Sequence, residues 1–218
     1  MLSSGTWMTE AYDADCIHCP RLAGFLADTR RRQPGYWARP VAPFGAEKAS
    51  LLIVGLAPGM HGANRTGRPF TGDHAGILLY ETLHELGIAT RPTSVSADDG
   101  LRLRNARITN AVKCLPPQNK PQPDEIRRCN TFLRSELAQL EGLRVVVALG
   151  RIAHDAVLMA LDRARSAHPF AHAREHSLAD SRWLVDSYHC SRYNTQTRRL
   201  TPTMFKSVMR RSCELAGL

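Results

Sequence analysis

The sequence of 218 residues has no run of about 20 apolar residues, which is the length that a membrane-spanning helix needs. Residues 1–14 lack the basic and apolar segments of a secretory signal, and we expect a flexible tail there. These absences argue against a membrane partner and predict a cytoplasmic protein. A reducing compartment favours cysteines that bind metal over cysteines in disulfides.

Acidic residues are scarce, with 20 against 29 basic residues and a formal charge of +9. Such an excess attracts polyanions, and nucleic acid is the leading class of partner. The charge is concentrated near the C-terminus, where residues 189–211 contain no acidic residue and six basic ones: Arg192, Arg198, Arg199, Lys206, Arg210 and Arg211. A basic surface without a role in nucleic-acid binding remains the alternative.

The chain contains six cysteines, and four of them form two separated pairs. Cys16 and Cys19 form a C-x2-C clip, from which two thiolates can reach one ion. Cys114 and Cys129 are separated by a much longer stretch, and this asymmetric spacing favours an iron-sulfur cluster over zinc, which remains the second choice. A simpler alternative is that Cys114 and Cys129 are buried apolar residues. Cys190 and Cys213 are expected to be unpaired.

Short apolar runs alternate with segments of helical periodicity, a pattern typical of a parallel sheet covered by helices. The sequence predicts an α/β fold, a three-layer αβα sandwich with a central four-stranded, mostly parallel sheet, in a single domain over residues 15–218. The expected strands lie at residues 51–54, 106–112, 144–149 and 183–185. The expected helices lie at residues 77–86 and 126–140, after Gly150 and from Thr201 onward, while residues 89–100 and 166–180 are expected to form loops.

Ligands of parallel sheets bind beyond the carboxyl ends of the strands. The first strand continues directly into a glycine-rich segment, GLAPGMHGANRTGRPFTGD, which ends at Asp73. The second strand presents Asn110, and His189 follows the fourth strand. We therefore expect an aspartate, an asparagine and a histidine to converge on one edge of the sheet.

Three segments carry a resemblance to a known family: GLAPGMHGANRTGRPFTGD, ITNAVKC (residues 108–114) and SYHCSRYNTQTRRLT (residues 187–201). They resemble the family-five class of uracil-DNA glycosylases, the iron-sulfur branch of bacteria and archaea. The resemblance implies a DNA repair enzyme that flips uracil out of DNA and hydrolyses its N-glycosidic bond, leaving an abasic site. It also implies a 4Fe-4S cluster held by Cys16, Cys19, Cys114 and Cys129.

The resemblance assigns the catalytic roles to Asp73, which would position water and stabilise a cationic sugar, and to His189, which would donate to uracil O2. Without the family motif, Asp73 could simply cap the helix that follows, and His189 could be an ordinary histidine at a strand end. Asn110 is expected to read the edge of uracil, although a buried asparagine can instead pair with backbone.

Phe70 would stack on the base or, as the alternative, belong to the core. Backbone groups around Gly55 and Ala57 would bind the base as in the family. The resemblance places DNA contacts on the loop after His189, at Arg192, Asn194, Arg198 and Arg199. The expected substrate is single- or double-stranded DNA that contains uracil, and the protein is expected to be a monomer.

Two departures from the family pattern affect that loop. Cys190 replaces an expected proline, and Arg198 replaces an expected glycine. From its sequence context, we expect the thiol of Cys190 to be exposed to solvent and open to oxidation. A non-catalytic iron-sulfur protein that binds nucleic acid or senses redox state is therefore the alternative function.

Overall fold

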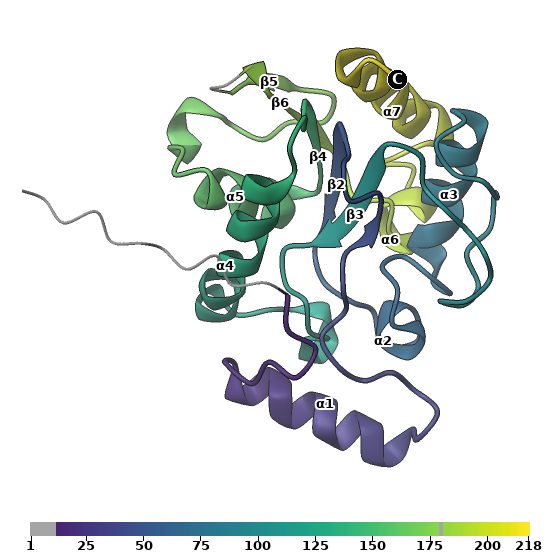
Figure 1. The fold of residues 1–218 in the computed structure, drawn as a ribbon, viewed down its shortest axis with the longest axis vertical. Coiled ribbons are helices and arrows are strands. Elements are labelled where there is room, and N and C mark those ends of the chain that lie inside the picture. The colour runs from purple at the N-terminus through teal and green to yellow at the C-terminus, as the bar shows by residue number, and fades with distance from the viewer. Residues whose placement is uncertain (1–11, 179–180) are drawn as a thin grey trace, which may run out of the picture.

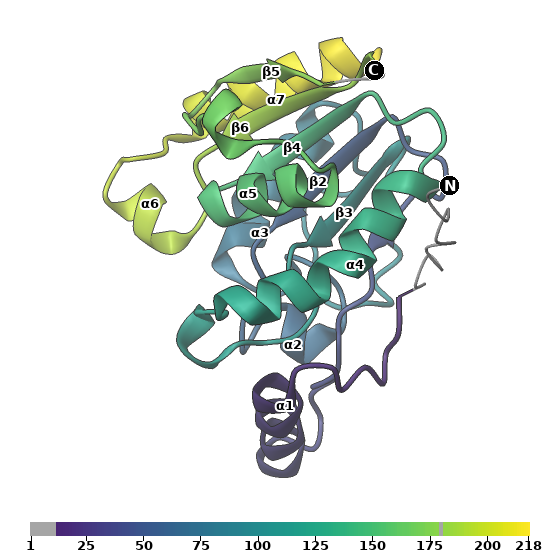
Figure 2. The same ribbon diagram turned by 90° about the vertical axis from the view of Figure 1, so that its left-hand side faces the viewer.

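A six-stranded sheet lies at the centre of the computed structural model, which describes residues 12–178 and 181–218 (Figures 1 and 2). The strands, in the spatial order β1-β3-β2-β4-β6-β5, are β1 (Phe44–Gly45), β2 (Leu51–Gly55), β3 (Ala106–Asn110), β4 (Val145–Leu149), β5 (Glu175–Ser177) and β6 (Trp183–Ser187). The four longer strands pair in parallel, whereas β1 and β5 add antiparallel edges. The predicted four-stranded parallel sheet is confirmed as the centre of this larger sheet.

Helices cover both faces of the sheet. They are α1 (Pro20–Arg32), α2 (Ala63–Thr66), α3 (His74–Glu85), α4 (Pro123–Gln139), α5 (Arg151–Ala160), α6 (Arg192–Gln196) and α7 (Pro202–Ala216), with 3-10 turns at Pro117–Asn119 and Arg165–Ala167. Helices α3 and α7 share one core with one face of β2 and β4, and α4 and α5 share a second core with the other face. The fold is therefore the predicted three-layer α/β sandwich.

The sequence explains this arrangement locally. In β2, Leu51 and Ile53 enter one core while Leu52 and Val54 enter the other, so the whole strand is buried. Helix α7 begins as predicted, since the Thr201 hydroxyl accepts a hydrogen bond from the amide of Met204. The prediction of a loop over residues 166–180 is wrong in one respect, because this segment contains β5.

Helix α1 lies apart from the sandwich (Figure 1). It packs through Leu22 and Leu26 against the segment that follows β3 and against α4. Of the tail expected over residues 1–14, residues 1–11 lie outside the described part, and the hydroxyl of Tyr12 donates to the carbonyl oxygen of Pro40 at 2.6 Å. Within residues 12–178 and 181–218, no helix combines the length and apolarity needed to cross a membrane.

Candidate active site and cysteine cluster

A cleft of about 560 Å³ opens at the carboxyl ends of the parallel strands. The loops after β2, β3, β4 and β6 all contribute to its walls. Six residues predicted for the site line this cleft: Ala57, Phe70, Asp73, Asn110, His189 and Arg192. The structure thus brings three distant segments of the sequence to one place.

Gly55 ends β2 and does not itself line the cleft, but it lies against two residues that do, Asn110 and Phe70. A Cβ atom at Gly55 would lie 2.4 Å from Oδ1 of Asn110 and 2.6 Å from Cζ of Phe70, so only glycine fits between them. Asn110 is 3% exposed, and its Oδ1 has no hydrogen-bond partner among the described residues. Leaving such an oxygen unpaired costs about 1–3 kcal/mol, and a hydrogen-bond donor on a bound molecule could remove that cost.

Asp73 has two structural relationships at once. Its Oδ1 accepts a hydrogen bond of 2.9 Å from the amide of Gly76 and so caps α3, as the simpler alternative predicts. The residue also lines the cleft, with Oδ2 so close to Gly62 that a Cβ atom there would lie 2.4 Å away. Burial raises the pKa of Asp73, while backbone hydrogen bonds from Gly76 and Ala75 oppose the rise.

His189 reaches the cleft from the segment after β6. Its ring lies 5.9 Å from the ring of Phe70, centre to centre, with an angle of 28° between the planes. Burial lowers the pKa of His189 to about 4, so the imidazole is neutral at pH 7. The next residue, Cys190, is fully buried, which contradicts its expected exposure to oxidation, and burial raises its pKa to about 12.

The predicted DNA-binding loop contains α6. Arg192 is exposed at the rim of the cleft, in a position that can meet a ligand. Asn194 instead donates from Nδ2 to the carbonyl oxygen of His189 at 2.8 Å. Its amide therefore supports the histidine segment from within the protein.

Arg198 and Arg199 lie at the end of the same loop and are both exposed. Arg198 has a φ of +57°, in the left-handed region that favours glycine, which explains why a glycine is expected there. The guanidinium of Arg199 lies 4.6 Å from the centre of the Tyr188 ring. This contact holds Arg199 beside the segment that leads to His189.

Sequence reasoning missed two residues near the cleft. Asn119 lines it from the loop after β3, with a φ of +56° next to Gln118 at +55°. Consecutive left-handed residues without glycine are uncommon and concentrate at functional sites. Tyr193, on α6, is 71% exposed. The proline pairs around Asn119 and the aromatic residue beside Arg192 were the available signals.

The four cysteines of the two sequence pairs, which form no disulfides, line one cavity, although they come from separate parts of the chain. Cys16 and Cys19 precede α1, Cys114 follows β3, and Cys129 lies in α4. Burial and the neighbouring thiols raise the pKa of Cys114, and burial raises that of Cys129 to about 11. The amide of Lys113 donates to Sγ of Cys129 at 3.2 Å. The site is thus rich in thiols that are costly to ionise without a cation nearby.

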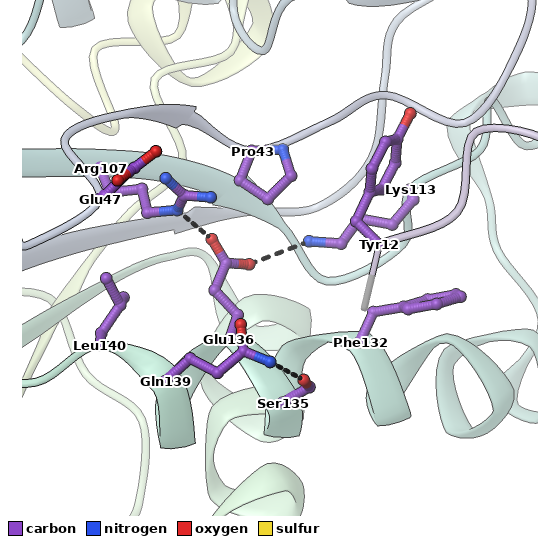
Figure 3. A pocket seen from close by; sticks show the side chains of 10 residues that line it. All are labelled: Tyr12, Pro43, Glu47, Arg107, Lys113, Phe132, Ser135, Glu136, Gln139 and Leu140. Carbon is purple, nitrogen blue, oxygen red and sulfur yellow. Dashed lines mark hydrogen bonds and ion pairs between the residues drawn. The ribbon is translucent and has the colours of Figure 1, made fainter. Parts of the chain in front are cut away.

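A second pocket has a volume of about 400 Å³ (Figure 3). In it, the carboxylate of Glu136 lies between Nε of Arg107, at 2.9 Å, and Nζ of Lys113, at 3.3 Å. Lys113 and Phe132 line both cavities. The buried Lys113 charge is thereby compensated beside the thiols.

Among the described residues, one group of three side chains offers ligand atoms that lie within 4.8 Å of one another: His154, His176 and Asp186. The Asp186 carboxylate lies 2.7 Å from Nδ1 of His154 and 3.1 Å from Nε2 of His176. Nε2 of His154 lies 2.8 Å from the carbonyl oxygen of His168. Both nitrogens of His154 thus face acceptors, and the group forms a buried hydrogen-bond network between α5, β5 and β6.

Comparison with known proteins identifies the family. The model of the uracil DNA glycosylase superfamily matches residues 42–211. A "Type-5 uracil-DNA glycosylase" of Thermus thermophilus is 49% identical over 208 residues, which cover 93% of this chain and 94% of the relative. A protein of the same name from Pyrobaculum aerophilum is 43% identical over 93% of this chain and 90% of its own length. A "Type-4 uracil-DNA glycosylase" of Archaeoglobus fulgidus is 41% identical over 50% of this chain and 47% of its own length. The chain belongs to the uracil DNA glycosylase superfamily.

Proposed function

We propose that this protein is a DNA repair glycosylase that flips uracil out of DNA and hydrolyses its N-glycosidic bond, leaving an abasic site. The observation that carries the proposal is the buried Oδ1 of Asn110, which lies near the ring of Phe70 and has no hydrogen-bond partner within the described part of the chain. Uracil offers a donor at N3 and a flat ring for stacking, and cytosine lacks that N3 hydrogen. Backbone groups at Gly55 and Ala57 would complete the contacts to the base.

Asp73 and His189 would act on the two charges that develop as the bond breaks. A carboxylate at Asp73 would stabilise the cationic sugar and orient the attacking water. A neutral imidazole at His189 would donate to O2 of the departing uracil anion. The lowered pKa of His189 supports this role, because the ring is neutral at pH 7 and a neutral imidazole still carries one N–H group that can donate.

The exposed arginines beside the cleft suit a DNA backbone. Arg192, Arg198 and Arg199 would contact phosphates, and Asn194 would support the loop that carries them. We further propose that the protein acts as a monomer in the cytoplasm, on single- or double-stranded DNA. Tyr193 would be the side chain best placed to enter the space that the flipped base leaves.

We infer that Cys16, Cys19, Cys114 and Cys129 hold a 4Fe-4S cluster, with zinc as the alternative. Tetrahedral zinc would bring four sulfur atoms to about 3.8 Å from one another. The four cysteines line one cavity, in which Cys114 and Cys129 are buried, and the asymmetric spacing of the two cysteine pairs favours the cluster. Bound there, the cluster would supply iron-thiolate bonds that tie α1 to α4.

A cleavage assay distinguishes the enzyme from a non-catalytic iron-sulfur protein on the same scaffold. Purified protein and Asp73→Ala would be incubated with a uracil-containing oligonucleotide, and abasic sites would be revealed by alkali. We expect cleavage by the wild type alone. No cleavage by the wild type would favour the non-catalytic alternative, and equal cleavage by the variant would refute the role of Asp73. Iron and sulfide analysis of the same samples tests the cluster, and stoichiometric zinc would overturn that part alone.

A further inference from the structure

Phe70 is held in a strained backbone conformation. Its φ is +53°, although it is a bulky residue that is only 5% exposed. A left-handed conformation costs such a residue about 1–2 kcal/mol and persists only where the surroundings enforce it. The turn is also tightly packed, because a Cβ atom at Gly76 would lie 1.9 Å from the carbonyl oxygen of Phe70.

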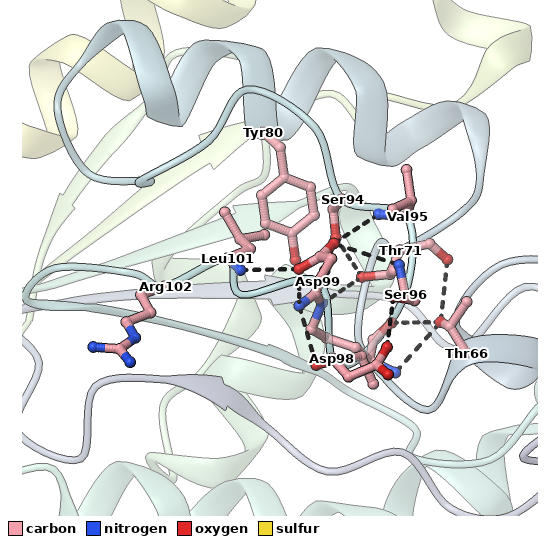
Figure 4. Close-up of polar contacts among 12 residues, drawn as sticks. Thr66, Thr71, Tyr80, Ser94, Val95, Ser96, Asp98, Asp99, Leu101 and Arg102 are labelled. Atoms are coloured by element: carbon pink, nitrogen blue, oxygen red, sulfur yellow. Dashed lines mark hydrogen bonds and ion pairs between the residues drawn. The ribbon is translucent and has the colours of Figure 1, made fainter.

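Arg68 and Thr71, which flank Phe70 at a distance of two residues and one residue, belong to one polar network. Figure 4 shows Thr71, Ser94 and Asp99 within this network. Arg68 is 3% exposed, and its guanidinium forms a two-pronged ion pair with Asp99, at 2.9 Å and 2.6 Å. Its Nε donates to the hydroxyl of Thr71 at 2.9 Å, and its Nη2 donates to the hydroxyl of Ser94 at 2.6 Å. A planar fork with this many partners has little rotational freedom.

The Asp99 end of the network is equally well defined. Its carboxylate accepts from the amides of Val95 and Leu101, each at 2.9 Å. Burial would raise the pKa of Asp99, but the hydrogen bonds from Arg68 and these amides hold it well below its ordinary value. The loop over residues 91–100 therefore acts as a brace for the turn at Phe70.

We propose that Arg68 and Asp99 are positioning residues that set the width of the base pocket by fixing Phe70, a role that rests on the proposed glycosylase function. The ring of Phe70 and the amide of Asn110 converge at Gly55 with no room for a methyl group. Hypoxanthine, a purine, presents the same C=O and N–H edge as uracil, so hydrogen bonding to Asn110 cannot separate the two bases. Any preference between the two bases would therefore depend on ring size, and a shift of Phe70 would change the space left for the ring.

The test compares excision of uracil and of hypoxanthine by Asp99→Asn and Arg68→Lys. Single-turnover rates would be measured with matched oligonucleotides that carry one base or the other. We expect the uracil rate to fall roughly tenfold, because a displaced wall misplaces the base, and the hypoxanthine rate to stay or rise. The ratio of the uracil rate to the hypoxanthine rate should therefore fall by about tenfold or more. The 19F NMR signal of fluorinated Phe70 should broaden, because its ring is held less firmly.

Two controls separate positioning from general destabilisation. Asp162→Asn breaks another two-pronged pair, with Arg134 at 2.6 Å and 2.7 Å, and Leu137→Ala weakens the core on the opposite face of the sheet. Neither should change the ratio of the two rates. If Asp99→Asn does not fold, Ser94→Ala removes one contact to Arg68 and serves the same test.

The outcomes are distinct. An inactive wild type would refute the proposed function itself. An active wild type with an unchanged ratio in the Arg68, Asp99 or Ser94 variants would refute the positioning role and leave the glycosylase function intact. A ratio that changes equally in the Leu137→Ala control would also refute it.

Discussion

The side-chain amide of Asn194 donates a hydrogen bond of 2.8 Å to the carbonyl oxygen of His189. This bond closes the segment between β6 and α6, and the hydroxyl of Ser191 caps the same turn by accepting from the amide of Asn194. The position of the His189 ring in the cleft therefore depends on a residue that the family resemblance assigns to DNA contact.

Replacing Asn194 with alanine tests this dependence. The lost hydrogen bond is worth about 1 kcal/mol, so we expect the single-turnover rate to fall roughly fivefold while the Kd for DNA changes little. Gln196→Ala, an exposed neighbour on α6, is the matched control and should change neither quantity. A weaker Kd with an unchanged rate would instead support a direct DNA contact by Asn194.

Gly55→Ala tests the close packing of Asn110 and Phe70 against the end of β2. The new Cβ atom would lie 2.4 Å from Oδ1 of Asn110, so both the amide and the Phe70 ring must shift. We expect uracil excision to fall by about 100-fold and the free energy of unfolding by about 1–3 kcal/mol. Gly35→Ala is the control, because its Cβ would meet no atom within 4 Å. An active Gly55→Ala enzyme would contradict the proposed position of the base.

The pH dependence of the rate follows from two shifted groups. Because the pKa of His189 is lowered to about 4, its ring stays neutral from about pH 6 to 8, and no step should appear near 6.5. Asp73 has a raised pKa, so its carboxylate gains a proton as the pH falls through that value, and the rate declines on the acid side. Single-turnover rates measured from pH 8 down into the acid range, as far as the protein stays folded, check both points. A step near pH 6.5 that disappears in His189→Ala would contradict the neutral donor.

Arg198→Gly separates backbone strain from charge. Glycine adopts a φ of +57° without a steric penalty, so we expect the free energy of unfolding to rise by about 0.5–1 kcal/mol. Loss of one phosphate contact should weaken DNA binding and reduce the slope of log Kd against log salt by about 0.9. Arg198→Ala should show the same binding loss without the gain in stability. An unchanged salt slope in both variants would remove Arg198 from the DNA interface.

The central fold is readable from the sequence because the parallel strands are buried on both faces and appear as continuous apolar runs, as in the Val145–Leu149 strand. The edge strands β1 and β5 have two and three residues, too few to show alternation. Helix α1 buries only Leu22, Leu26 and Thr29, and this sparse pattern conceals it.

The candidate site shows the same division. Asp73, Asn110 and His189 follow predicted strands directly, so topology alone brings them to one edge. Asn119 lies in a loop where it and Gln118 both have positive φ values, which the sequence does not reveal. The side chain of Asn194 points inward because it donates one hydrogen bond to the carbonyl oxygen of His189. The burial of Cys190 likewise depends on tertiary packing, which local composition does not encode.

A single substitution at Asn110 tests whether this side chain recognises the hydrogen-bonding edge of uracil. Asn110→Asp replaces an amide, which can donate to O4 and accept from N3–H, with a carboxylate that only accepts. Single-turnover release of free base would be measured for uracil and for cytosine in matched oligonucleotides. We expect uracil release to fall by about 100-fold and the ratio of the uracil rate to the cytosine rate to decrease. Uracil release at the wild-type rate, with the preference unchanged, would contradict this role of Asn110.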